Sequence, residues 1–132
     1  MHAYFDASDG NPKVVLKISS GRKEKEIKAL MDTGHNGSLS LSIWDLIDIG
    51  AKLSTVGEVE FADGNKGTVY YFRVKVIIDG VKKEIEAGMI ENSNVTEAIA
   101  GLELFSPYVA VINFKNKKIN FYTETELKKI KF

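Results

Sequence analysis

Apolar and polar residues alternate with a period of two along most of this chain. In the stretch VVLKI, the apolar side chains of Val14, Leu16 and Ile18 fall on one face. The same alternation runs through residues 27–31 and, over its longest stretch, through residues 72–78. Because successive side chains of a strand point to opposite faces of a sheet, this period predicts half-buried β-strands.

Short turn sequences separate these alternating stretches. Asp79-Gly80 is a two-residue hairpin signal between residues 72–78 and residues 81–89, and Lys115-Asn116 separates VAVINF from KINFY. Asp, Asn and Gly turns of this kind join neighbouring antiparallel strands. The chain is therefore predicted to be mainly antiparallel β and to form one domain over residues 1–132.

Helical periodicity is sparse. Ser42 and Asp45 have the spacing of a helix cap before an apolar segment, and Gly50 follows as a stop. Trp44, on this short helix, is expected in the core. GLELFSPY is compatible with one or two helical turns, and residues 123–132 with either a short helix or an extended arm. We expect one or two short helices in all.

The composition is typical of a soluble globular chain and excludes several classes of site. Because 18 Lys and Arg residues balance 18 Asp and Glu residues, no global field attracts nucleic acid or an anionic membrane. The chain has no cysteine, and its 2 histidines lack ligand spacing, so we predict no metal site and no cofactor. No signal peptide and no apolar run of about 18 residues is visible, which indicates a cytoplasmic protein without a membrane segment.

One predicted strand ends on a carboxylate, and this is the position with the most chemical content. The apolar residues Ala29 to Met31 lead directly into Asp32-Thr33-Gly34. A carboxylate at the end of a buried strand is costly unless it has a partner. A second carboxylate that shares a proton with it is such a partner. Gly34 permits close backbone approach and Thr33 offers a hydroxyl, although the tripeptide alone is also compatible with a simple turn.

Beyond the tripeptide, the order of segments over residues 12–122 resembles the retropepsin-like aspartic proteases, in particular their short single-domain prokaryotic members. ALMDTGHNGSLSLS is followed by a long hairpin sequence, VEFADGNKGTVYYFRVKV, and then by AIAGLELFSPYVAVINFKNKKINF. The resemblance implies an all-β acid-protease fold: a closed, mainly antiparallel β-barrel with one or two short helices. Residues 12–122 would form the core of this single domain.

The same resemblance implies roles for individual residues. Asp32 would be catalytic, and Thr33 and Gly34 would support the active-site loop. The hairpin from about Val56 to Phe72 would be a flap over the substrate. The tip of this flap would comprise Ala62, Asp63, Gly64 and Asn65, and the second signature of the family would comprise Ile99, Ala100 and Gly101.

The chain carries a single Asp-Thr-Gly, so the resemblance implies that a second copy supplies the other aspartate. A homodimer would then hydrolyse peptide bonds in extended peptides or proteins. Leu102 and Glu103 follow the second signature, where retroviral members have an arginine and then a carboxamide or aspartate. The alternative is therefore a non-catalytic peptide-binding or dimerisation module on the same fold. His35, a lone loop histidine, is expected to be solvent-exposed.

Overall fold

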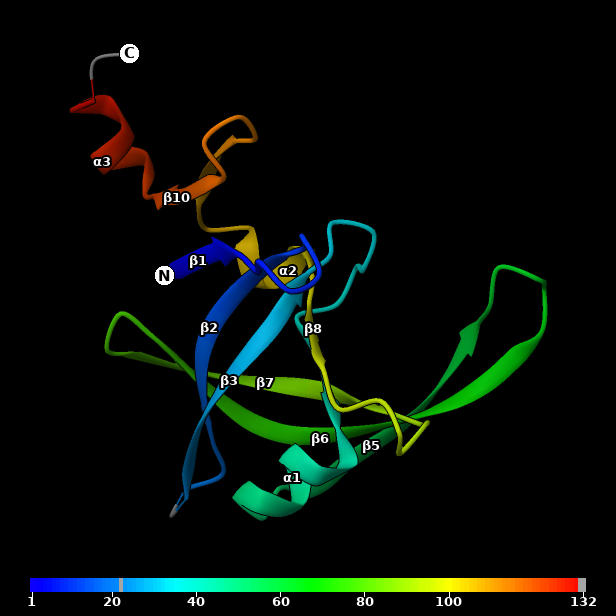
Figure 1. The fold of residues 1–132 in the computed structure, drawn as a ribbon. Helices are drawn as coiled ribbons and strands as arrows, with labels where there is room; N and C mark the ends of the chain where they lie inside the picture. The colour runs from blue at the N-terminus through cyan, green and yellow to red at the C-terminus, as the bar shows by residue number, and fades with distance from the viewer. Residues whose placement is uncertain (22, 131–132) are drawn as a thin grey trace.

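Ten β-strands and three short helices make up the computed structural model, which describes residues 1–21 and 23–130 (Figure 1). The strands are β1 (His2–Phe5), β2 (Pro12–Ser19), β3 (Glu24–Met31), β4 (Leu39–Ser42), β5 (Lys52–Glu60), β6 (Lys66–Ile78), β7 (Val81–Ile90), β8 (Ala98–Ala100), β9 (Val109–Asn113) and β10 (Lys118–Tyr122). The helices are α1 (Ile43–Ile49), α2 (Leu102–Phe105) and α3 (Glu124–Lys128). The mainly β structure predicted from the alternation is confirmed.

Six of these strands close into a barrel. They follow the order β2-β3-β8-β4-β7-β6, and a further pairing between β2 and β6 closes the ring. Most neighbouring strands are antiparallel, but the pairs β3–β8 and β4–β7 are parallel. Strand β1 lies outside β2, β5 lies outside β6, and β9 and β10 form a separate two-stranded sheet. The prediction of a closed, mainly antiparallel β-barrel is therefore confirmed.

The barrel interior contains the apolar side chains that the alternation places on one face. Val14, Leu16 and Ile18 of β2 are at most 2% exposed, and Val74 and Val76 of β6 are equally buried. Lys17 of β2 and Lys75 of β6, which alternate with these residues, are exposed. Full burial of an aliphatic side chain contributes about 1.5–3 kcal/mol, so this inward face is the main source of stability for the barrel.

Helix α1 connects barrel strand β4 to the long β5–β6 hairpin. The Ser42 hydroxyl accepts a hydrogen bond from the Asp45 backbone N–H at 3.1 Å, and Gly50 ends the helix with a φ of 67°, as predicted. The prediction that Trp44 lies in the core is wrong, because its side chain is 52% exposed. Position 44 lies off the buried face of α1, and the indole N–H donates to the Ser93 carbonyl at 2.9 Å.

The described residues contain three helices, against the one or two expected. The third is α3, in the C-terminal stretch for which the sequence left a helix or an arm open. A capping box between Thr123 and Glu126 starts this helix. Arg22, Lys131 and Phe132 lie outside the described residues, and the last two belong to that stretch.

Two features extend from the barrel and define where a site can form. The loop between β3 and β4 lies at one end of the barrel, and the β5–β6 hairpin extends well past the end of β7 (Figure 1). The β9–β10 sheet and α3 lie apart from this hairpin, near β1 (Figure 1).

Candidate active-site loop and groove

Residues 32–38, here called the Asp-Thr-Gly loop, connect β3 to β4, and β8 lies between those two strands. Strand β8 pairs with β3 in parallel and with β4 in antiparallel orientation, so it contacts the strands on both sides of the loop. The Asp32 backbone N–H donates to the Ala100 carbonyl at 2.9 Å, and the Gly101 N–H donates to the Ser38 carbonyl at 2.9 Å. The second signature is therefore brought directly to the loop.

Asp32 is half-buried at the start of a tight turn. Its carboxylate Oδ1 accepts a hydrogen bond from the Gly34 N–H at 2.8 Å, and its backbone carbonyl accepts one from the His35 N–H at 3.2 Å. A Cβ at Gly34 would lie 3.1 Å from that Oδ1, so any side chain there would crowd the carboxylate. Thr33 is exposed in the same turn.

Gly101, in the predicted second signature, packs tightly against the loop. A Cβ at Gly101 would lie 2.2 Å from the Gly37 carbonyl oxygen and 2.6 Å from the His35 carbonyl oxygen. These are backbone atoms that cannot rotate away. The following amide, Leu102 N–H, donates to the same His35 carbonyl at 2.9 Å. The start of α2 thus bonds to the loop, and only glycine fits between them.

The prediction that the His35 side chain is solvent-exposed is wrong. Its ring is half-buried and lies against Gly101, and Nε2 is 3.2 Å from the Ser40 hydroxyl. The ring therefore packs inside the Asp-Thr-Gly loop. An isolated loop histidine gives no indication of this packing, because the glycine that receives the ring is 66 positions further along the chain.

A second contact within the site was not foreseen from the sequence. The Ser38 hydroxyl donates to Glu103 Oε2 at 3.0 Å, and the Glu103 N–H donates to the Gly37 carbonyl at 3.3 Å. Glu103 is one of the two residues that depart from the retroviral pattern. Here its carboxylate bonds to the loop of its own chain, where it adds a further link between α2 and the Asp-Thr-Gly loop.

A groove of about 860 Å³ lies between the loop and the long hairpin. Its lining includes Gly34 and His35 of the loop, Val59 and Val69 of the hairpin, and several residues of β7, among them Gly88. The lining contains both apolar and charged side chains. An open groove of this kind, bordered by strands, suits an extended chain because such a ligand pairs its main chain with the protein.

The four predicted flap-tip residues, Ala62 to Asn65, form the turn at the end of the hairpin. The Asn65 N–H donates to Asp63 Oδ1 at 2.9 Å, and Gly64 has a φ of 84°, which favours glycine. Among the described residues that line the groove, none belongs to this tip. The strands of the hairpin, rather than its tip, therefore border the groove in this structure.

The described residues carry neither a side-chain cluster that could hold a metal ion nor a helix that could cross a membrane. No group of three or more His, Cys, Asp or Glu side chains there is arranged to hold a metal ion. None of the helices in the described ranges is long and apolar enough to cross a membrane.

Comparison with known proteins supports the fold. No protein-family model matches the chain, and no curated protein matches it. Among solved structures, the EIAV protease complexed with the inhibitor HBY-793 is similar, with a TM-score of 0.54 and 12% sequence identity. The match covers 76% of this chain and 90% of the viral one. At this identity the likeness shows the fold alone, and this chain has a retropepsin-like fold.

Proposed function

We propose that this chain is an aspartic endopeptidase that acts as a homodimer, with one Asp32 carboxylate supplied by each protomer. The observation that supports this most is the Asp-Thr-Gly loop on a retropepsin-like barrel. β8 holds the Asp32 backbone next to a groove that the following residues Gly34 and His35 line. Asp32 itself does not line this groove, and in the proposal its carboxylate reaches the bound chain where the loops of the two protomers meet.

The proposed mechanism follows from two carboxylates that are too close to ionise together. One Asp32 stays protonated while the other is charged, and a water molecule is bound between them. The charged carboxylate removes a proton as the water attacks the scissile carbonyl. The protonated carboxylate donates to the developing oxyanion, and a proton then passes to the leaving amine.

The other residues of the loop have supporting roles in this proposal. Gly34 donates its backbone N–H to Asp32 and, having no side chain, leaves room for a second loop to approach. Thr33 is exposed in the turn, where its hydroxyl is available to a partner loop. The β5–β6 hairpin would close over an extended substrate and exclude water from it.

A non-catalytic peptide-binding or dimerisation module is the second candidate. Glu103 favours it, because this residue departs from the retroviral pattern and its carboxylate bonds to Ser38 of the same chain. In this case the groove would bind an extended chain without cleaving it. A peptidase would cleave peptides in a mixture, whereas a binding module would leave the same peptides intact.

Two measurements, made one after the other, test the proposal. Sedimentation at micromolar concentration is expected to show a dimer, because a monomer holds only one Asp32. The dimer is then expected to cleave members of a diverse peptide mixture, and a statine-type transition-state mimic is expected to suppress that cleavage. A strict monomer, or a dimer that binds peptides and releases them intact, would contradict the peptidase.

A further inference from the structure

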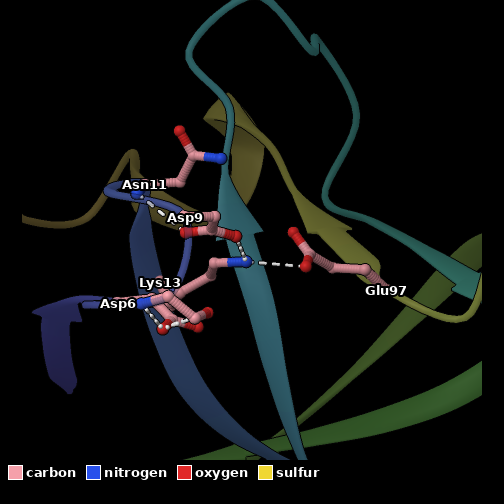
Figure 2. A network of polar contacts seen from close by, with 6 residues as sticks. Asp6, Asp9, Asn11, Lys13 and Glu97 are labelled. Carbon is pink, nitrogen blue, oxygen red and sulfur yellow. Dashed lines mark hydrogen bonds and ion pairs between the residues drawn. The ribbon is translucent and has the colours of Figure 1, made fainter.

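A buried lysine with two carboxylate partners lies outside the proposed catalytic machinery. Lys13 Nζ is 2.8 Å from Asp9 Oδ2 and 2.6 Å from Glu97 Oε2 (Figure 2). The Lys13 side chain is 3% exposed, whereas those of Asp9 and Glu97 are 38% and 43% exposed. The ammonium is thus enclosed, and its two partners reach it from more open positions.

Both carboxylates of this triad act on the Lys13 ammonium. Burial alone would lower the pKa of Lys13, but hydrogen bonds to Asp9 and Glu97 outweigh it and raise that pKa above its ordinary value. The hydrogen bond from Lys13 also lowers the pKa of Asp9. Because a buried charge is tolerated only when it is paired, Lys13 is held at this place by both carboxylates.

The triad connects three segments across one strand. Lys13 is on β2 and lies opposite Leu30 of β3, which in turn lies opposite Ile99 of β8. Glu97 immediately precedes β8. Because β3 lies between β2 and β8, the Lys13 side chain must cross β3 to reach Glu97, and Figure 2 shows it doing so. The Lys13 side chain starts level with Leu30, about 7 Å along the strand from Asp32, and ends at Glu97, one residue before the pair of Ala98 with Ala29.

Strand β8 is held near its start by the pairing of Ala98 with Ala29 of β3 and, further upstream, by the Trp44 indole on the Ser93 carbonyl. It is only three residues long, and every residue of the preceding segment, 91–97, is exposed. Yet its far end carries the bonds that hold the site, namely Asp32 N–H to the Ala100 carbonyl and Gly101 N–H to the Ser38 carbonyl. A shift of β8 along β3 would therefore displace the Asp32 backbone.

We propose that Lys13 is a positioning residue for Asp32: it ties the start of β8 to β2 across β3, and so fixes the backbone on which Asp32 is held. This inference rests on the proposed peptidase function. The two carboxylates of the triad then differ in their importance for the position of Asp32. Glu97 is the partner that adjoins β8, whereas Asp9 lies in the turn between β1 and β2.

The chain offers a matched control for Lys13. Lys25 also pairs with two carboxylates, those of Asp45 and Asp48, and hydrogen bonds to them raise its pKa. It lies on β3 as well, but about 23 Å along the strand from Asp32. Lys25→Met therefore removes a lysine with the same number of carboxylate partners without touching β8, although the Lys25 side chain is 35% exposed and that of Lys13 is 3% exposed.

The test compares Lys13→Met and Glu97→Gln with Asp9→Asn and Lys25→Met in the dimeric protein. We expect kcat to fall about 10- to 100-fold in the first two variants, with KM within about twofold of wild type. We expect kcat within about twofold of wild type in Asp9→Asn and Lys25→Met. Equal losses of kcat in all four variants, or wild-type kcat in Lys13→Met and Glu97→Gln, would overturn the positioning role.

Amide hydrogen exchange of Asp32 is a second measurement, and it does not depend on activity. Its N–H is expected to exchange faster in Glu97→Gln, relative to global unfolding, and to stay as protected as wild type in Asp9→Asn. If wild type cleaves no peptide but this difference is found, the peptidase proposal fails and the positioning role of the triad stands. An unchanged Asp32 amide in Glu97→Gln would overturn it.

Discussion

Replacing Asp32 by Asn is expected to abolish peptide hydrolysis while leaving the fold and the dimer intact. The introduced carboxamide has an oxygen that still accepts the Gly34 N–H, which in wild type bonds to Asp32 Oδ1 at 2.8 Å. It can neither remove a proton from water nor share one with a second carboxylate. We expect kcat to fall by at least about 10³-fold.

The measurement is a peptide-cleavage assay paired with thermal unfolding and sedimentation of the same Asp32→Asn preparation. Thermal unfolding checks that the fold is retained, and sedimentation checks that the variant still dimerises. Cleavage at a rate close to wild type by this variant would remove Asp32 from the mechanism.

The second large effect is expected for Gly101→Ala. The added Cβ would lie 2.2 Å from the Gly37 carbonyl oxygen, so the Asp-Thr-Gly loop or the start of α2 would have to move. Overpacking against backbone of this kind costs about 3 kcal/mol of the free energy of unfolding. Because the displaced loop carries Asp32, hydrolysis is expected to be lost as well.

Gly88→Ala is the matched control for stability, because Gly88 is also buried. A Cβ there would lie 3.5 Å from its nearest neighbours, the Ser40 hydroxyl and a Val69 methyl, which is ordinary contact. Urea denaturation of both variants is expected to separate them clearly. If Gly101→Ala unfolds at the same urea concentration as Gly88→Ala, the close packing at Gly101 is refuted.

The regular parts of the fold were predictable because they depend on local sequence. Alternation in β2 and β6 correctly identified their buried faces. The Asp79-Gly80 turn was predictable because both residues take positive φ, 51° and 79°, which suits a two-residue hairpin. The helix cap at Ser42 followed from its spacing to Asp45.

The arrangement of the site depended on contacts between distant segments, and local pattern does not contain these. β8 is three residues long, which is too short to show a period, and its parallel pairing with β3 follows from no turn signal. Lys13 occupies a polar position of an alternating strand and looks solvated. Its burial depends on Glu97, which lies 84 residues away.

The proposal that two chains form one site is tested most directly by mixing wild type with Asp32→Asn and allowing the subunits to exchange. With equal amounts of the two, random pairing leaves about half of the wild-type chains in dimers that have both Asp32 carboxylates. We therefore predict that activity per wild-type chain falls by about half, and approaches zero as Asp32→Asn is added in excess. Activity per wild-type chain that stays constant at every mixing ratio would show that one chain acts alone, and would contradict the shared site.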